Sequence, residues 1–478
     1  MTITGHDQAV PSATVIGPGG RTPPPKVIDA GDNGDIETSH VFDPSHNGID
    51  FWESLEGMRV EIDNAQVVGP TNSFGETSVV PVGSGTRTTR GGIVARAGDL
   101  NPERVVMAPT LAPVPTASVG DRYNGATIGV LDYDFGNYEI LPTTSPQLHK
   151  GNLQRQVTRK QTPGELAVAT FNVENLSPKD PQSKFDTLGH YAVHNLAAPD
   201  VLALEEIQDN DGPTNDGVVA ADQTLQNLID AIKAAGGPTY ESAEIDPTND
   251  ADGGQPGGNI RVAFLYRTDR GLHFIARGNG DATTATTVTA DSHHQPQLSL
   301  SPGRIAPTDD AWLASRKPLV GQFSFHGKTV FVIANHFDAK LADDPLFGRY
   351  QPPREPSAVQ RHQQATLVND FVGDIEQIDH NADVVVVGDL NDFDFSQTTS
   401  IITGSHALVD LPSTLPAAQR YTYVYQGNSE VLDHILLSPA LARSRWDYDY
   451  QPVHVNSEFA DQISDHDPQI VRLRIPTY

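Results

Sequence analysis

The sequence contains no cysteine, so this 478-residue chain has no disulfide, no thiolate metal site and no cysteine nucleophile. Cationic residues are also scarce, because 32 Lys and Arg stand against 61 Asp and Glu and give a formal net charge of −29. A field of this sign repels nucleic acid and anionic membranes at long range. No apolar stretch approaches the ~20 residues that span a bilayer, so no transmembrane segment is expected. Any phosphate-containing substrate must therefore be met by a bound metal or a confined basic groove.

The composition favours a loop-rich α/β or β protein over a helical bundle or a disordered chain, with 41 Gly, 36 Pro and 37% hydrophobic residues. The first 20 or so residues lack the basic start and apolar run of a signal peptide. Removal of an earlier leader is an alternative that the sequence leaves open.

Changes in composition along the chain predict four segments. Residues 1–50 are rich in Gly, Pro, Asp and Ser, which predicts an extended or poorly ordered lead-in with few core residues. Short β-like runs such as MRVEIDNAQVV and ETSVVPV predict a β-rich accessory module at 51–140. The polar, Pro-punctuated stretch 141–164 has the composition of a linker. From 165 to 478, β-like runs alternate with amphipathic segments, which predicts a layered α/β domain.

Polar residues follow the apolar runs of this second domain at six places. They are Asn172 and Glu174 in FNVEN, Glu206 in LALEEI, Asn335 and His336 in ANHF, Asp389 and Asn391 in GDLND, Asp433 in LDHILLS, and Asp465 and His466 in SDHDP. Taken singly, each has an ordinary structural explanation as a turn former, a core histidine or a helix cap. Because α/β scaffolds present catalytic groups at strand ends, their co-occurrence predicts one site. Carboxylate and amide oxygens favour Mg²⁺, Mn²⁺ or Ca²⁺ over zinc.

This ordered set of motifs resembles the endonuclease/exonuclease/phosphatase superfamily over about residues 165–478. The resemblance is nearer to bacterial extracellular nucleases in which a β module precedes the catalytic domain. It implies a four-layer α/β sandwich of the DNase I-like type, two packed β-sheets flanked by helices, preceded by a smaller β-rich domain. It also implies a secreted protein that uses Mg²⁺ or Mn²⁺ at its active site.

The resemblance assigns a role to each motif position. Asn172, Glu174, Glu206 and Asp465 match metal-side residues of the family. Among the catalytic positions, His466 is oriented by Asp433, Asp389 and Asn391 position the attacking water and the phosphate, and His336 contacts the phosphate or the leaving group.

Two positions depart from the family pattern. Glu205 replaces the usual glutamine before the metal-binding glutamate, and it either binds a second cation or faces solvent. Some members support the second histidine with a carboxylate, but the corresponding stretch here offers Asn259 and Arg261, so the role of His336 is open.

A local excess of cationic residues between residues 304 and 361 would suit a substrate backbone, although ordinary surface ion pairs explain it equally well. Arg316, Lys340 and Arg361 are the candidates for contacts with the substrate phosphate. The acidic loop 208–217 fits either a structural Ca²⁺ site or an ordinary turn.

The predicted function is a divalent-metal-dependent phosphodiester hydrolase, specifically an extracellular nuclease that cleaves DNA or RNA. The partner is a nucleic acid or another phosphodiester, and no stable protein partner is implied. A phosphatase and a sphingomyelinase-like phospholipid hydrolase are the alternatives within the superfamily, and no obvious apolar insertion supports the latter. A catalytically inactive binding protein is the alternative from another class, although every motif position holds a competent residue.

Overall fold

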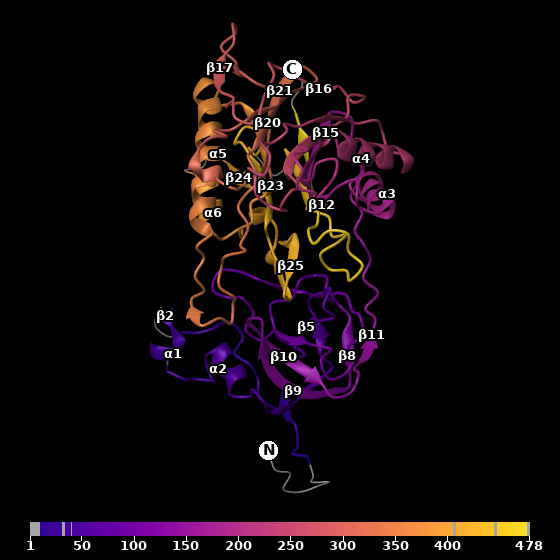
Figure 1. The fold of residues 1–478 in the computed structure, drawn as a ribbon, viewed down its shortest axis with the longest axis vertical. Helices are drawn as coiled ribbons and strands as arrows, with labels where there is room; N and C mark the ends of the chain where they lie inside the picture. The colour runs from indigo at the N-terminus through magenta and orange to yellow at the C-terminus, as the bar shows by residue number, and fades with distance from the viewer. Residues whose placement is uncertain (1–9, 31–33, 40, 405–407, 444–446, 476–478) are drawn as a thin grey trace.

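The computed structural model describes residues 10–30, 34–39, 41–404, 408–443 and 447–475. Residues 1–9, the start of the predicted lead-in, lie outside the described residues. A β-rich N-terminal part lies at one end of the long axis, and a layered α/β part occupies the other end (Figure 1).

The N-terminal part is built on a nine-stranded sheet. In spatial order its strands are β1 (Thr14–Ile16), β3 (Arg59–Asp63), β9 (Ala126–Asp134), β10 (Asn137–Pro142), β7 (Val105–Met107), β5 (Thr77–Val80), β4 (Gln66–Val67), β8 (Arg122–Asn124) and β11 (Gln147–His149). The segment 14–50 contributes more to this sheet than its composition indicated. Strand β1 pairs in parallel with β3, and Ile16, Ile28 and Ile49 are buried in its core. The β-rich character is as predicted, and the exact domain boundaries stay a prediction.

The C-terminal part contains two large sheets. One has the order β14 (Glu241–Ala243), β15 (Arg261–Tyr266), β13 (Val201–Ile207), β12 (Glu165–Leu176), β29 (Gln469–Arg474) and β28 (Tyr448–Pro452). The other has the order β16 (Leu272–Phe274), β20 (Leu319–Phe325), β21 (Lys328–His336), β23 (Asp383–Asp389), β27 (Asp433–Leu437) and β24 (Val409–Asp410), and β19 (Gly303–Arg304) pairs with β20.

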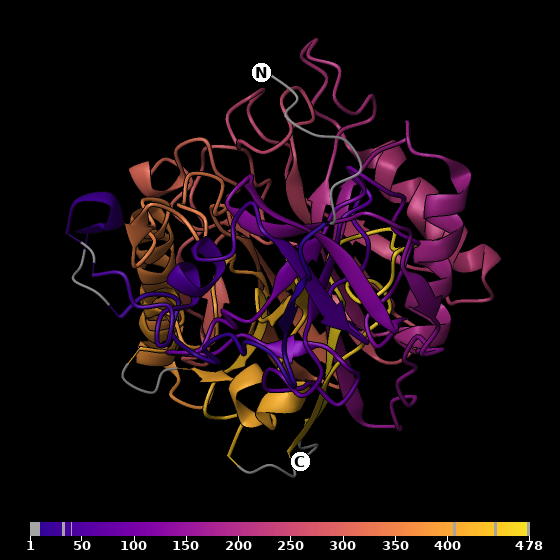
Figure 2. The ribbon, with the colours of Figure 1, turned by 90° about the horizontal axis from the view of Figure 1, so that it is seen from below.

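Helices cover the outer faces of both sheets. The first sheet carries α3 (Gln182–His190), which continues into the π-helical turn η1 (Tyr191–Asn195), and α4 (Asp222–Ala234). The second sheet carries α5 (Ala358–Ile378), and α6 (Gln397–Thr403) lies against α5. Figure 2 shows these two helix layers on opposite sides of the sheets, orange on one side and magenta on the other. The predicted four-layer α/β sandwich is therefore confirmed.

Shorter elements complete the described chain. They are α1 (Ile36–Ser39), α2 (Gly48–Glu53), η2 (Asp310–Trp312), η3 (Pro412–Thr414), η4 (Ala417–Gln419), the pairs β2 (Gly34–Asp35) with β22 (Tyr350–Gln351) and β17 (Val288–Ala290) with β18 (Pro296–Leu298), and the three-stranded sheet of β25 (Tyr423–Tyr425), β26 (Asn428–Glu430) and β6 (Ile93–Val94). No helix among the described ranges is both long enough and apolar enough to cross a bilayer.

Residue patterning explains the layers. Strand β23 is a continuous apolar run because both of its faces are covered, as is usual for a central strand with a parallel neighbour. Helix α4 places Leu225, Leu228, Ile229 and Ile232 on one face at helical spacing, and these side chains are buried against the first sheet. Alternate residues of the two sheets meet in a common apolar core, and polar side chains begin where that core ends.

Candidate active site

The polar residues predicted from the motifs converge because of strand direction and register. Strands β21 and β23 run parallel, which places His336 opposite Asp389 at their ends. Strand β27 runs antiparallel to β23, which places Asp433, its first residue, beside Asp389. The first sheet brings Asn172 of β12 to Asp389, across the interface between the two sheets. Residues from four strands therefore meet at one edge of the sandwich.

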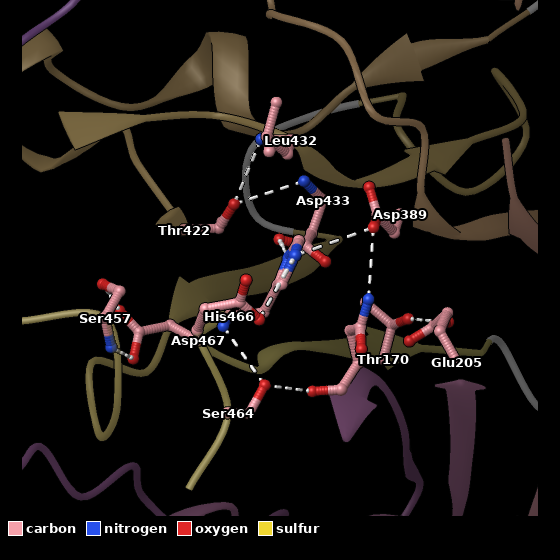
Figure 3. A network of polar contacts seen from close by, with 12 residues as sticks. Thr170, Glu205, Asp389, Thr422, Leu432, Asp433, Ser457, Ser464, His466 and Asp467 are labelled. Atoms are coloured by element: carbon pink, nitrogen blue, oxygen red, sulfur yellow. Dashed lines mark hydrogen bonds and ion pairs between the residues drawn. The ribbon is translucent and has the colours of Figure 1, made fainter. Parts of the chain in front are cut away.

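His466 lies between two aspartates at the centre of this cluster (Figure 3). Its Nδ1 is 2.8 Å from Asp433 Oδ2, and its Nε2 is 3.7 Å from Asp389 Oδ2. Burial alone would lower the pKa of His466, but the carboxylates of Asp433 and Asp389 outweigh burial and raise it well above the usual value. The Ser464 hydroxyl accepts a hydrogen bond from the His466 backbone N–H and donates one to the Asn172 carbonyl, which fixes the backbone here. The predicted orientation of His466 by Asp433 thus has the geometry it requires.

Asn172 connects the two sheets. Its Nδ2 donates to Glu206 Oε1 at 3.0 Å and to Asp389 Oδ2 at 3.2 Å, while its Oδ1 accepts from the Glu174 backbone N–H. A register shift in β13 and a φ of +62° at Glu206 aim the Glu206 side chain toward this edge. With this amide assignment, Asn172 holds the carboxylates in place with its nitrogen, and its oxygen faces the backbone.

Glu174 and Asp465 lie on the more open side of the cluster. Partial burial and the nearby carboxylate of Asp465 raise the pKa of Glu174 to about 7. Asp465 keeps 40% of its side chain exposed, and its Oδ1 is 3.9 Å from His466 Nε2. Burial, opposed by His466 and reinforced by Asp433, likewise raises the pKa of Asp389 to about 7. Several carboxylates thus share one small region.

This donor set fits a hard divalent cation. Ligand atoms of Asp389, Asp433 and His466 all lie within 4.8 Å of one another, the one such group of three among the described residues. Glu206, Glu174 and Asp465 add carboxylates that repel one another. A cation would relieve this repulsion, and oxygen-rich sites favour Mg²⁺ or Mn²⁺. Asn172 donates to both Asp389 and Glu206, so these two carboxylates lie close together and would be among the residues that hold such an ion.

Asn391 follows Asp389 in a left-handed conformation with φ of +50°. Its backbone N–H donates to Asp389 Oδ1 at 2.8 Å, and its Nδ2 donates to the Phe337 carbonyl at 3.1 Å. The loop that connects β23 to the rest of the site is therefore locked against the end of β21.

His336 is almost fully buried, with Nε2 3.6 Å from Asp389 Oδ2 and 3.8 Å from Glu206 Oε1. Burial and the Arg316 guanidinium lower the pKa of His336 well below its usual value, so the imidazole is neutral at neutral pH. No described residue hydrogen-bonds its Nδ1. Asn259 and Arg261 contact Asp209 and Asp246 instead, so neither residue supports this histidine.

The three residues predicted to contact the substrate phosphate differ in burial and in their partners. Arg316 is buried beside the cluster, where Glu206 and Asp389 act on its charge and its Nη2 donates to the Phe337 carbonyl. Lys340 is partly exposed at 24%, pairs with Asp392 at 3.1 Å and lies over the Phe393 ring.

The prediction that Arg361 contacts the substrate phosphate does not agree with the structure, because its side chain is fully buried inside an ion-pair network. Its Nε donates to Asp392 Oδ2 at 3.1 Å, its Nη1 donates to Ser357 Oγ at 2.6 Å, and its Nη2 lies 3.5 Å from Asp343. These contacts leave no exposed donor for a phosphate, so the geometry gives Arg361 a structural role.

Glu205 neither faces solvent nor sits where a second cation would enter. It is fully buried, its Oε1 accepts from the Thr170 hydroxyl at 2.6 Å, and its Oε2 has no partner among the described residues. The acidic loop 208–217 brings Asp209 and Asp216 near Asp211, and partial desolvation with these carboxylates raises the pKa of Asp211. A structural Ca²⁺ in that loop stays a prediction.

Two residues of the site carried no motif. The Thr422 hydroxyl accepts from the backbone N–H groups of Leu432 and Asp433, each at 3.2 Å. The Tyr423 ring lies 4.7 Å from the His466 ring. Their stretch, RYTYVYQGN, signals only a β-hairpin.

Comparison with known families decides the assignment. Residues 169–466 match the model of the Endonuclease/Exonuclease/phosphatase family. The chain belongs to this family. Residues 15–151 match a separate domain of unknown function, DUF8508, whose limits agree with the nine-stranded sheet. No curated protein matches the chain in sequence.

Several solved structures are similar to this chain at low sequence identity. A humanized D. rerio TDP2 is 17% identical, with 65% of this chain and 100% of that one covered and a TM-score of 0.39. The endonuclease/exonuclease/phosphatase from Bacteroides vulgatus is 17% identical, with 65% of this chain and 99% of that one covered and a TM-score of 0.39. The human Nocturnin catalytic domain is 14% identical, with 65% of this chain and 94% of that one covered and a TM-score of 0.39.

Proposed function

We propose that this member of the Endonuclease/Exonuclease/phosphatase family is a divalent-metal-dependent phosphodiester hydrolase, and specifically a secreted nuclease that cleaves DNA, with RNA as the alternative polymer. The observation that carries the proposal is the arrangement of His466, whose Nδ1 contacts Asp433 at 2.8 Å while its Nε2 faces Asp389 at 3.7 Å.

This arrangement suits activation of a water for in-line attack. Asp433 accepts a hydrogen bond from the Nδ1–H of His466 and stabilises the charged imidazole, which leaves Nε2 to exchange a proton with the reacting water. A water within hydrogen-bond distance of both His466 Nε2 and Asp389 Oδ2 is held by two groups that Asn391 and Ser464 keep in place. Proximity and orientation of this kind account for a large part of enzymatic rate enhancement.

The opposite side of the cluster suits the phosphate. The Arg316 guanidinium and the neutral imidazole of His336 lie beside Asp389 and Glu206, where negative charge develops on the phosphoryl and leaving oxygens. Asp389 and Glu206 would help to hold a divalent cation, which would supply Lewis-acid polarisation of the phosphoryl group. Glu174 and Asp465 complete the donor set toward solvent. Mg²⁺ and Mn²⁺ match these oxygen donors.

The test is hydrolysis of plasmid DNA, RNA, bis-p-nitrophenyl phosphate and p-nitrophenyl phosphate with Mg²⁺ or Mn²⁺, by the wild type beside His466→Ala. We expect cleavage of DNA and of the small diester, lost with EDTA and in the variant. Hydrolysis of the monoester alone would move the protein to the phosphatases, and inactivity on all four substrates would contradict nuclease function. Detection of the native protein in culture medium rather than in cells tests secretion.

A phospholipid diester is the second candidate substrate, and two exposed side chains favour it. Leu313 and Leu341 are 74% and 95% exposed, although the sequence suggested no apolar insertion. They lie in the loops that carry Arg316 and Lys340, where a lipid surface could be met. Hydrolysis of sphingomyelin vesicles by the wild type, weakened in Leu341→Ser, would favour this candidate over DNA.

A further inference from the structure

The hairpin of β25 and β26 joins the N-terminal sheet to the active site. Figure 1 shows β25 between the purple N-terminal part and the strands of the sandwich. The base of this hairpin contacts the catalytic pair, and its tip contacts the N-terminal part. The contact at the tip was not visible in the sequence, because β6 and β26 are separated by more than 300 residues.

The base of the hairpin fixes both members of the Asp433–His466 pair. The Thr422 hydroxyl accepts from the Asp433 backbone N–H at 3.2 Å, and the Thr422 carbonyl accepts from the Asp467 backbone N–H at 2.8 Å. Tyr423 forms a backbone bridge with His466, and its ring is tilted against the imidazole at 4.7 Å. The position of His466 relative to Asp433 therefore depends on where the hairpin lies.

The tip of the hairpin is held by strand β6 and the turn after it. Strand β6 pairs in parallel with β26, and the Ala95 backbone N–H donates to the Ser429 carbonyl at 3.0 Å. Asn101 Nδ2 donates to Asn428 Oδ1 at 2.8 Å. The buried Arg104 donates to the Gln426 carbonyl at 3.1 Å and to its side-chain oxygen at 3.3 Å.

At the tip, the hairpin approaches the N-terminal part so closely that no side chain fits between them. A Cβ at Gly69 would lie 3.0 Å from the backbone N and Cα of Gly427. A Cβ at Gly427, which has a φ of +89°, would lie 2.7 Å from Ser78 Cβ. Two glycines therefore let the hairpin rest directly on the N-terminal sheet.

An isolated two-stranded hairpin is marginally stable in water, whereas a third strand and a packed face stabilise it. Strand β6 is that third strand here, and it belongs to the N-terminal part. We propose that the N-terminal β module positions His466 and Asp433 through the β25–β26 hairpin, as a structural part of the active site rather than a separate substrate-binding module. The inference rests on the proposed hydrolytic function, because positioning is measured by its effect on that reaction.

The test uses Arg104→Ala and Gly69→Ala, with Arg122→Ala as the matched control. Arg122 lies on β8 of the same sheet, is exposed and contacts Asn124 within its own strand. The substrate is bis-p-nitrophenyl phosphate, which is too small to bridge the active site and the sheet. We expect kcat to fall roughly 10- to 100-fold in both test variants with KM changed less than about threefold, since small misplacements carry costs of this size. A kcat equal to that of the control would overturn the proposal.

Tyr423 gives a second, independent variant that leaves the N-terminal part intact. Tyr423→Phe keeps the ring against His466 and should therefore have a higher kcat than Tyr423→Ala, which should lose kcat as Arg104→Ala does. If activity were lost only through a general loss of stability, the decrease in kcat of each variant would follow the decrease in its melting temperature. Equal activity of the Ala and Phe variants would overturn the role of the ring.

Histidine NMR separates failure of this proposal from failure of the proposed function. The ring resonances of His466, assigned by their absence in His466→Gln, should shift in Arg104→Ala and stay unchanged in Arg122→Ala. This holds even for a wild type that is inactive on every substrate, which would refute the function alone. Unchanged His466 resonances in folded Arg104→Ala and Gly69→Ala would overturn the positioning role.

Discussion

Glu205 and Thr170 are joined beneath the catalytic cluster by a 2.6 Å hydrogen bond from the threonine hydroxyl to one carboxylate oxygen of Glu205. The second oxygen is buried with no partner among the described residues. Burial, reinforced by the nearby charges of Asp433 and Asp389, raises the pKa of Glu205 well above its usual value. The folded chain thus favours the neutral carboxyl, which explains how an acid can occupy a fully enclosed position.

Glu205→Gln should therefore stabilise the metal-free protein at neutral and higher pH. A folded-state pKa above the unfolded one means that stability is lost as pH rises above the unfolded value, and glutamine removes this loss. We expect a gain in the free energy of unfolding at pH 8, which disappears near pH 4. Urea unfolding with EDTA measures it, with the exposed Glu355→Gln as control. Equal stability of variant and wild type at pH 8 would contradict the prediction.

Asp433→Asn should abolish most of the activity without unfolding the protein. Asparagine keeps the size of the side chain but lacks the negative charge that holds the Nδ1 proton of His466 and stabilises the charged imidazole. We expect kcat for bis-p-nitrophenyl phosphate to fall by about 10² to 10⁴, the usual range for loss of acid–base catalysis. Asp461→Asn is the control, because Asp461 is 77% exposed. Comparable kcat values for the two variants would refute the role of Asp433.

The fold was readable from the sequence because its layers depend on local patterning. The apolar run of β23 and the helical spacing in α4 and α5 indicate a covered sheet whatever the tertiary details. Helix α3 was not predicted because Gly189 and His190 obscure its apolar face. The role of residues 14–50 in the N-terminal sheet depends on the pairing of β1 with β3, which their composition does not reveal.

The site was predictable to the extent that each residue sits at the end of a strand. Asp389 and Asp433 meet because the register of β23 and β27 places them opposite each other. His466 lies just before β29, and the order of the motifs was enough to predict that it joins them. Burial depends on long-range packing, so the sequence indicated neither the enclosure of Glu205 nor that of Arg361. The contact of Tyr423 with His466 likewise depends on a hairpin held by a distant strand.

Arg361→Met should destabilise the protein strongly while leaving substrate binding unchanged. The guanidinium is fully buried against Asp392, and removing one member of a buried ion pair leaves an uncompensated charge that costs about 3 to 5 kcal/mol. Arg354→Met is the control, because its ion pair with Asp344 is exposed and contributes about 1 kcal/mol or less. Urea unfolding and KM for DNA measure the two effects. A raised KM at full stability would restore Arg361 as a phosphate contact.

His434 should make stability depend on pH between neutral and alkaline values. Its Nδ1 lies 2.8 Å from Asp410 and its Nε2 lies 3.0 Å from the Asp392 carbonyl. Burial alone would lower the pKa of His434, but Asp410 outweighs it and raises the pKa to about 9, above an unfolded value near 6.5. Because the pKa is higher in the folded chain, protonation of His434 stabilises the fold fully below about pH 6.5, and this stabilisation is lost as pH rises through about 9.

Asp410→Asn isolates this effect, because the neutral amide no longer favours the charged form of His434. The difference in unfolding free energy between wild type and variant should be largest near pH 6, at up to about 3 kcal/mol, and should shrink by pH 9.5. Urea titrations across this range measure it, and Asp461→Asn should keep the pH dependence of the wild type. A difference that stays constant from pH 6 to pH 9.5 would show that His434 is neutral in the folded chain and that Asp410 stabilises it only as a hydrogen-bond acceptor.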